Sequence, residues 1–340
     1  MTSTTHEQAT PTTASHGQRL VEGYAPSQIS YPSGWYLFCR ASEARRGPVR
    51  KTLLNKKLVA FVTESGNPGV IAAGCVHMGA DLGGGEIVGE TLRCPLHHWR
   101  FDVSGRCCEI PASDDVPGFA QQRGYPATIR HGNLYFFKGD DAAYPLPFFE
   151  GVEVAELVAS RPFIEYVDCP WYMVGANAVD VQHFAIAHDR EMLGRPEVAH
   201  PNSHVHNTVC RFRIRGGSVA DALTRHFGGP ESRLEVTDWS STMIFARSTL
   251  ARSETFGMLS LVPVSERRTM VQVIVMAKRG SNPMRRLLDP ARARIRRALI
   301  RRFLRSDVGR LSGTFYSPNS LIEIDQQFGE YFDWLATLPR

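Results

Sequence analysis

The stretch GCVHMGADLGGG, residues 74–85, places Cys75 and His77 two positions apart in a glycine-rich segment. A second stretch, LRCPLHHW, carries Cys94 and His97 three positions apart. Together they form the pattern C-x-H, sixteen residues, then C-x2-H, in which each stretch supplies one thiol and one imidazole. Four such ligands in two short segments indicate a metal site.

The way the ligands are grouped distinguishes between metals. A zinc finger presents a cysteine pair followed by a histidine pair, whereas here each stretch mixes the two types. Two thiolates on one iron and two imidazoles on the other are the arrangement of a Rieske [2Fe–2S] centre. The glycines let backbone amides approach the bridging sulfides. We therefore predict a Rieske cluster on Cys75, His77, Cys94 and His97, with zinc or two unrelated turns as alternatives.

Length and composition predict a globular protein of two domains. The chain has 340 residues, of which 43% are hydrophobic. It has no run of about 18 apolar residues, and Thr, Ser and Ala stand near its start where a signal peptide has an apolar segment. Seven cysteines without regular spacing argue against a disulfide scaffold. We expect a cytoplasmic protein with a disordered leader over residues 1–24.

The order of strand and helix patterns predicts an α+β fold. Short strands separated by turns indicate an N-terminal antiparallel β domain, which we assign to residues 25–145. The proline-containing stretch DDAAYPLPFF leads to a second domain over residues 146–340. That domain is expected to have a helix near 174–190, then strands such as TMVQVIVMA, and a helix from Asp289 onward.

A second group of candidate ligands lies in the string NAVDVQHFAIAH, which contains Asn177, Asp180, His183 and His188. Two histidines and one carboxylate, with open positions left on the metal, form the facial triad of non-haem iron(II) oxygenases. Histidines five residues apart on a regular helix point about 140° from each other. The spacing therefore predicts a bulge or break within residues 184–187. Ordinary core histidines are the alternative.

The third iron ligand is expected in the C-terminal helical segment. Apolar residues recur every four positions from Ile295 to Phe303, and the next step reaches Asp307. On this pattern the Asp307 carboxylate points inward beside the core, where it needs a partner such as iron. The alternatives are a surface position for Asp307, or a ligand from Asp325 or Asp333.

The two motifs together resemble the catalytic α subunit of the Rieske non-haem iron oxygenases, over most of the chain. The stretches CVHMGADL, CPLHHWRFD and DVQHFAIAH are similar to the branch of 3-ketosteroid 9α-hydroxylase and cholesterol desaturase. The tail, FLRSDVGRL followed by SPNSLIEID, resembles the family's third-ligand segment, which supports Asp307. The resemblance implies an antiparallel-β Rieske domain followed by a helix-grip, START-like catalytic domain with a large antiparallel sheet and covering helices.

The resemblance also implies an activity and partners. In the family, electrons from NAD(P)H reach the cluster through a flavin reductase or ferredoxin, and cross to the mononuclear Fe(II) of a neighbouring subunit in a homotrimer. By motif, Asp180 would bridge His183 and a cluster histidine, His97, across that interface, with Asn177 near the iron. O₂ would then oxidise a hydrophobic small molecule such as a steroid, terpenoid or aromatic compound.

Several activities share these ligands. Monohydroxylation is the activity that we expect, and desaturation, demethylation and oxidative cyclisation are alternatives within the same iron chemistry. A different class of protein, a Rieske electron carrier or redox sensor with a ligand-binding second domain, is also open, although a carrier has no need of His183 and His188.

The net charge of +5 is modest, and much of it comes from residues 285–310. A general affinity for nucleic acid is therefore not indicated. The arginine-rich helix over residues 289–305 is expected to be a solvated amphipathic helix. A docking surface for an acidic ferredoxin or for anionic lipid is the alternative, so membrane association stays open.

Overall fold

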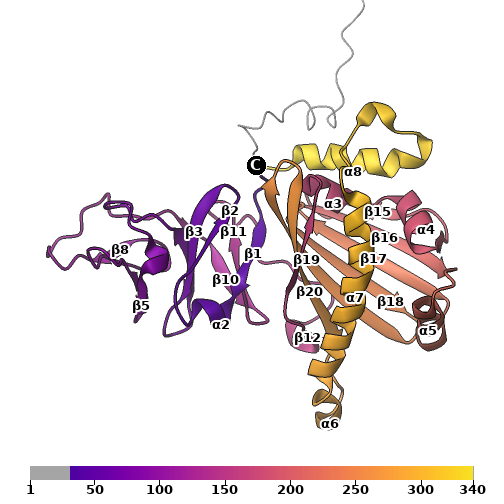
Figure 1. Cartoon of the computed structure of the whole chain (residues 1–340), viewed down its shortest axis with the longest axis horizontal. Coiled ribbons are helices and arrows are strands. Elements are labelled where there is room, and N and C mark those ends of the chain that lie inside the picture. The colour runs from indigo at the N-terminus through magenta and orange to yellow at the C-terminus, as the bar shows by residue number, and fades with distance from the viewer. Residues whose placement is uncertain (1–30, 340) are drawn as a thin grey trace, which may run out of the picture.

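The protein consists of two lobes that lie side by side along its long axis (Figure 1). The computed structural model describes residues 31–339, so the expected leader over residues 1–24 lies outside the described residues. Antiparallel sheets dominate both lobes, and helices cover the sheet of the second one. The α+β fold class is therefore confirmed, and the boundary between residues 145 and 146 stays a prediction.

Three small antiparallel sheets build the first lobe, in the strand orders β1-β11-β10, β2-β3-β4-β9 and β5-β6-β7-β8. Their strands are β1 Trp35–Arg40, β2 Val49–Leu53, β3 Lys56–Val62, β4 Pro68–Ala72, β5 Glu86–Val88, β6 Thr91–Arg93, β7 Arg100–Phe101, β8 Cys107–Glu109, β9 Gly124–Tyr125, β10 Ala127–Arg130 and β11 Asn133–Phe137. Two short helices, α2 Ala41–Ala44 and the 3-10 turn η2 Leu82–Gly84, complete the lobe. The β5–β8 sheet lies at the end of the molecule farthest from the second lobe (Figure 1).

A nine-stranded antiparallel sheet forms the second lobe, in the order β12-β20-β19-β18-β17-β16-β14, with β13 also paired to β20 and β15 to β16. Its strands are β12 Leu157–Ala159, β13 Phe163–Val167, β14 Arg190–Met192, β15 Glu197–Ala199, β16 Val205–Ile214, β17 Glu231–Trp239, β18 Met243–Leu250, β19 Ser253–Ser265 and β20 Arg268–Lys278. Apolar residues such as Val271, Val273 and Val275 on β20 are buried.

Helices cover this sheet, and the longest of them crosses it diagonally (Figure 1). They are α3 Trp171–Ala176, α4 Val181–His188, α5 Val219–Gly228, α6 Pro283–Arg286, α7 Asp289–Leu311 and α8 Gln326–Thr337, with 3-10 turns η3 Val154–Glu156, η4 Pro318–Ser320 and η5 Glu323–Asp325. Helix α7 packs against β20, β13 and β12. Over residues 31–339, no helix combines the length and apolar character needed to cross a bilayer.

The prediction that the apolar stripe from Ile295 to Phe303 faces the core is wrong. Ile295 and Leu299 are 61% and 60% exposed, whereas Asp307 is buried. A step of four residues overshoots one helical turn by about 40°, so three steps from Ile295 rotate the direction by about 120°. The stripe therefore spirals around the helix, and other residues face the sheet. Ile300, Leu304, Val308 and Leu311 pack against the core.

The two lobes share one hydrophobic core, which fixes their relative position. Tyr36 and Phe38 of β1 belong to the same buried cluster as Val271 of β20. Between these side chains, the Leu37 backbone N–H donates to Ser260 Oγ at 3.0 Å, and the Leu37 carbonyl accepts from Gln272 Nε2 at 2.6 Å. Buried hydrogen bonds of this kind are costly to break, because the donor and the acceptor would then lie in the core, away from water, without that partner.

A buried acid joins the C-terminal helix to the sheet. Asp238, on β17, accepts the Ser241 N–H at 2.8 Å through Oδ1 and the Tyr331 hydroxyl of α8 at 2.6 Å through Oδ2. The Tyr331 hydroxyl also lies 3.2 Å from Ser241 Oγ. Burial raises the pKa of Asp238 to about 7, although these hydrogen bonds act in the opposite direction.

Replacing Asp238 by asparagine should remove a pH dependence of stability. The amide mimics the protonated acid, since it can accept from Ser241 and donate to Tyr331. In the wild type the folded pKa of about 7 exceeds the unfolded value of about 3.9. The stabilising contribution of protonated Asp238 is therefore complete below about pH 4 and is lost as the pH rises to about 7.

Denaturant unfolding of both proteins between these pH values is the measurement. The free energy of unfolding of the wild type, relative to Asp238→Asn, should fall by up to about 1.4 kcal/mol per pH unit. Other titrating groups cancel in this difference. Parallel pH profiles for the two proteins would contradict the assignment.

Candidate metal centres

The first candidate centre lies in two loops beside the β5–β8 sheet. Cys75 and Cys94 are buried in the core of this lobe, and their thiols are close enough to hydrogen-bond. Burial raises the pKa of Cys75 to about 11 in the metal-free chain. The imidazoles of His77 and His97 are exposed, with ring centroids 4.8 Å apart. The structure thus brings all four residues together.

Backbone hydrogen bonds shape the two loops in the same way. The Gly79 N–H donates to the Cys75 carbonyl at 2.7 Å, and the Cys75 N–H donates to Ala80 at 2.8 Å. Gly79 adopts a φ of +75°, which explains a glycine at this position. In the other loop the Cys94 N–H donates to the Trp99 carbonyl at 2.8 Å. Each loop therefore folds back on its cysteine.

The donor set fits a Rieske cluster. The buried thiols and the exposed imidazoles form two pairs, so one iron would lie inward on sulfur and the other outward on nitrogen. The indole of Trp99 stacks on His77 with a centroid separation of 4.4 Å and an interplanar angle of 7°, and fixes its orientation. The loops also present Met78 and Leu96, which are 68% and 55% exposed. The outer face around the histidines is therefore partly apolar.

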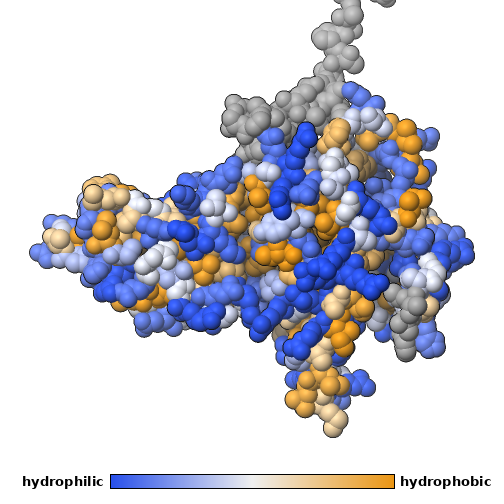
Figure 2. Space-filling model, viewed as in Figure 1, coloured by the Kyte–Doolittle hydropathy of each residue, from blue (hydrophilic) through white to orange (hydrophobic). Residues whose placement is uncertain are grey.

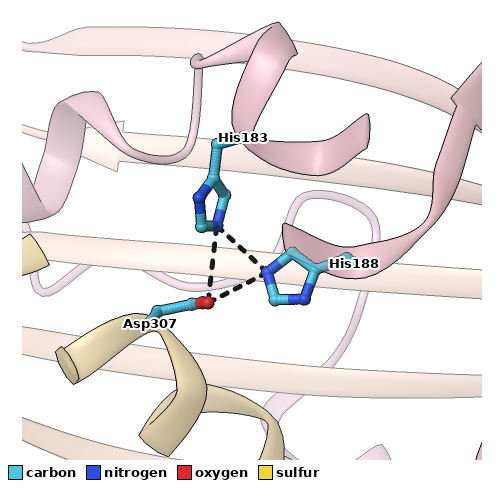
Figure 3. Close-up of side chains that lie close together, drawn as sticks. All are labelled: His183, His188 and Asp307. Atoms are coloured by element: carbon cyan, nitrogen blue, oxygen red, sulfur yellow. Dashed lines mark hydrogen bonds and ion pairs between the residues drawn. The ribbon is translucent and has the colours of Figure 1, made fainter. Parts of the chain in front are cut away.

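The second candidate centre combines His183, His188 and Asp307 (Figure 3). His183 Nε2 and His188 Nε2 lie 3.0 Å apart, and Asp307 Oδ1 lies 3.4 Å and 3.0 Å from them. The three side chains are between 5% and 9% exposed. Two ligand atoms about 2.1 Å from one ion and 90° apart are about 3.0 Å from each other. The geometry of this triad therefore fits one metal ion with the three ligands on one side of it.

Helix α4 positions the two histidines. Asp180 caps its first turn, because its Oδ1 accepts the backbone N–H of His183 at 3.0 Å. The helix continues without a break through residues 184–187 and ends at His188. Asp189 then adopts a left-handed conformation, and its N–H donates to the Phe184 carbonyl.

The predicted bulge within residues 184–187 is therefore wrong. The helix ends directly after His188 and turns through Asp189, so the distortion follows the two histidines and does not separate them. Flexible χ angles also swing both imidazoles toward one point between α4 and α7, although their Cα–Cβ bonds diverge (Figure 3).

Helix α7 supplies the carboxylate. Burial disfavours the charged form of Asp307, but hydrogen bonds and positive charge from His183 and His188 outweigh it and lower the pKa of Asp307 to about 2. The competing carboxylates lie elsewhere: Asp325 accepts from Gln182 at 2.7 Å, and Asp333 is exposed. Asp307 is thus the acid that the structure brings to the two histidines.

Two further side chains contact the triad. Asn177 Nδ2 lies 3.5 Å from His183 Nε2. Phe303 stacks on His188 with a centroid separation of 4.1 Å and an interplanar angle of 20°. Phe303 lies one helical turn before Asp307 in the sequence. This spacing could have predicted that Phe303 lies near the triad.

A cavity of about 350 Å³ adjoins the triad, between the sheet and helices α4 and α7. The His183, His188 and Asp307 side chains form part of its wall, and most of the rest is apolar. Apolar lining residues include Val236, Ile244, Leu259, Val273, Ile300 and Leu304. A mostly apolar cavity with a few polar groups at one place is typical of a small-molecule site.

Comparison with known sequences agrees with a Rieske cluster at the first centre. The family model of the Rieske [2Fe–2S] domain matches residues 34–120. Cholesterol 7-desaturase nvd of Xenopus laevis is 30% identical over 198 residues, which are 56% of this chain and 43% of that protein. A 3-ketosteroid-9-alpha-monooxygenase oxygenase component of Rhodococcus rhodochrous is 31% identical over 175 residues, 48% of this chain and 44% of its own.

A third relative has a small substrate in its name. The tert-butanol monooxygenase / tert-amyl alcohol desaturase oxygenase subunit of Aquincola tertiaricarbonis is 33% identical over 159 residues, 46% of this chain and 34% of that protein. The matched segments thus span less than half the length of these curated relatives.

Solved structures share the fold across both lobes. The NdmA protein of Pseudomonas putida CBB5, as a mutant with theobromine, gives a TM-score of 0.66 at 19% identity and covers 88% of both chains. Dicamba monooxygenase bound to dicamba gives 0.60 at 16% identity and covers 89% of this chain and 96% of that one. The chain therefore contains a Rieske [2Fe–2S] domain. Its resemblance to the Rieske non-haem iron oxygenases is confirmed.

Removing the Asp307 carboxylate should empty the second centre and spare the first. We expect Asp307→Ala to lower the iron content from about three to about two irons per chain, because a Rieske cluster holds two. Anaerobic purification followed by iron analysis and visible absorption of the cluster is the measurement. Asp333→Ala, an exposed carboxylate of α8, is the control. Equal iron content in both variants would remove Asp307 from the ligand set.

Proposed function

We propose that this protein is the oxygenase component of a Rieske monooxygenase, which uses O₂ and external electrons to hydroxylate a hydrophobic small molecule. The observation that carries the proposal is the triad of His183, His188 and Asp307 in the wall of a mostly apolar cavity. In this proposal Cys75, His77, Cys94 and His97 hold the cluster, and the triad holds Fe(II).

The residues of the chain have distinct tasks in this activity. When bound, the two iron centres supply electrons and O₂ activation at the triad. The cavity holds the substrate next to the triad and keeps bulk water away. Phe303 and Asn177 restrict the orientations of His188 and His183. In balance, substrate, O₂, two electrons and two protons give a hydroxylated product and water.

The position of the two centres supports a homotrimer. The β5–β8 sheet, whose flanking loops carry the cluster residues, lies at one end of the molecule, and α4 lies at the other (Figure 1). Electron transfer falls steeply with distance, so the cluster of one chain would serve the triad of a neighbour. In this proposal Asp180 forms the bridge between the two centres. Its Oδ1 accepts the His183 N–H, and within residues 31–339 its Oδ2 takes part in no hydrogen bond, which supports this role.

The electron donor in this proposal is a ferredoxin or a flavin reductase, which draws on NAD(P)H. We place the reaction in the cytoplasm, with which seven free cysteines agree. The substrate class is apolar, as the cavity lining indicates. A steroid, a terpenoid and an aromatic compound are the candidates. Desaturation, demethylation and oxidative cyclisation remain the alternative outcomes at the same triad.

An electron carrier with a ligand-binding second lobe is the proposal from another class. Such a carrier would bind only the cluster, and its second lobe would need no metal. The buried triad counts against it, because an Asp and two His side chains in an apolar wall are costly to bury without an ion. The iron content separates the two proposals.

Turnover with a panel of apolar substrates tests the activity. Purified protein with a surrogate reductase and NADH should consume O₂ and yield a product heavier than its substrate by one oxygen atom. Loss of two hydrogens instead would assign desaturation or ring closure. If every substrate leaves O₂ uptake at the level of the substrate-free enzyme, and iron analysis gives only the cluster, the electron carrier is correct.

Asp180→Asn should uncouple the centres without removing either metal. We expect kcat to fall by a factor of about 10 to 100, which is typical when a ligand's hydrogen-bond partner is changed. The cap to His183 is retained, since an Asn side chain also accepts that N–H. Iron content and cluster reduction by the reductase should stay at wild-type levels. Unchanged kcat would show that Asp180 serves only as the helix cap.

A further inference from the structure

Helices α6 and α7 expose a row of apolar side chains, of which only Phe303 also contacts the second candidate centre. We call it the apolar ridge, and its six members are between 39% and 81% exposed. They are Met284, Leu287, Leu288, Ile295, Leu299 and Phe303. Figure 1 shows α6 and the start of α7 projecting beyond the edge of the sheet, and Figure 2 shows the apolar residues gathered on this projection.

The ridge is a second apolar face of α7. At 100° per residue, Ile295, Leu299 and Phe303 lie within a sector of about 80°. Ile300 and Leu304 point the other way and pack against the core. A helix that only covered a sheet would need one apolar stripe and would be polar outside it. The ridge therefore calls for a partner outside the fold.

Arginines border the ridge and outnumber the local acids. Residues 285–310 contain ten arginines and two aspartates, an excess greater than the +5 of the whole chain. Both aspartates are buried. Within residues 31–339, no carboxylate lies within ion-pair distance of the exposed Arg285, Arg294 or Arg302.

Other arginines of α7 are used internally, which sets these three apart. Arg301 and Arg305 donate to Glu165 at 2.7 Å and 3.3 Å, and Arg292 pairs with Asp289 at 3.2 Å. On the helix, Arg302 lies about 20° from Ile295, directly beside the ridge, and the exposed Arg294 lies about 100° from Ile295 on the same side. The free positive charge and the apolar side chains therefore share one outward surface (Figure 2).

We propose that the apolar ridge and its flanking arginines dock this protein on an anionic membrane surface. Long apolar side chains beside arginines are the composition of helices that lie in the interface of a bilayer. The ridge projects from the molecule and is not a groove, so it can insert between lipid headgroups. A layer of headgroups accommodates a convex shape more readily than the surface of a folded protein does. Anionic headgroups supply the countercharge for Arg285, Arg294 and Arg302.

The cavity lies next to the ridge, so docking would bring it close to the bilayer. Phe303 belongs to the ridge and also lines the cavity beside Ile300 and Leu304. It is 39% exposed, so this one side chain belongs both to the outer surface and to the cavity wall. Docking would bring this part of the cavity wall to the bilayer, where apolar molecules concentrate. The inference does not depend on the oxygenase activity, because docking would bring the cavity close to any apolar ligand that concentrates in the bilayer.

Vesicle co-sedimentation with the purified, cluster-loaded full chain tests the proposal. The probes are vesicles of phosphatidylcholine alone and of phosphatidylcholine mixed equally with phosphatidylglycerol. We expect sedimentation with the mixed vesicles, much less with phosphatidylcholine alone, and release by added NaCl. No sedimentation with mixed vesicles at low salt would overturn the proposal.

Two sets of variants assign the binding to this surface. Leu287→Ser/Ile295→Ser/Leu299→Ser should abolish sedimentation, whereas Val264→Ser/Ile322→Ser/Ile324→Ser, which changes three exposed apolar residues elsewhere, should retain it. All six positions are exposed, so folding should be preserved; thermal midpoint and cluster absorption check this.

Arg294→Gln/Arg302→Gln should weaken binding by about 25-fold, at about fivefold for each arginine. Arg252→Gln/Arg267→Gln is its charge-matched control, also on exposed positions. Equal losses in the ridge variants and their controls would overturn the assignment. A smaller mass by light scattering for the serine ridge variant alone would assign the ridge to contacts between copies, and would also overturn it.

Discussion

The second lobe is organised around three ligand atoms that converge in an apolar environment. His183 Nε2, His188 Nε2 and Asp307 Oδ1 lie within 3.4 Å of one another. Lone pairs on two imidazole nitrogens 3.0 Å apart repel each other unless a proton or a cation lies between them. With neutral imidazoles and an ionised Asp307, the triad carries one buried negative charge, for which a divalent ion is a suitable partner.

Helix α7 couples this site to the cavity. Its core-facing side carries Asp307 and also presents Ile300 and Leu304 to the cavity. Arg301 and Arg305 attach the helix to Glu165 of β13, and Asp289 accepts the Gly280 N–H at 3.0 Å. These polar contacts set the position of α7 along its axis. A shift by one turn would remove the carboxylate from the histidines and reshape the cavity wall together.

What the sequence predicts well is local. The Cys and His residues of the first centre lie within two short loops, so their spacing alone brings each pair together. Asp307 illustrates the opposite case, since the four-residue stripe selected the acid that the structure brings to the two histidines, but for a wrong geometric reason. The rotation of about 120° along that stripe leaves Ile295 and Leu299 outside, and only the packing of α7 on β20 decides which face is buried. The course of α4 was missed for a similar reason, because its end is set by the left-handed Asp189.

The shared core of the two lobes limits how the two centres can communicate. Leu37 of the first lobe is bonded to Ser260 and Gln272 of the second by buried hydrogen bonds, within a continuous apolar core. A hinge between the lobes would have to expose this core, so rotation of the first lobe cannot carry its far end to α4 at low cost. The partly apolar outer face around His77 and His97 is instead suited to contact with another protein surface. Because the two candidate centres lie at opposite ends of this chain, the proposed oxygenase would have a short electron path only between neighbouring copies.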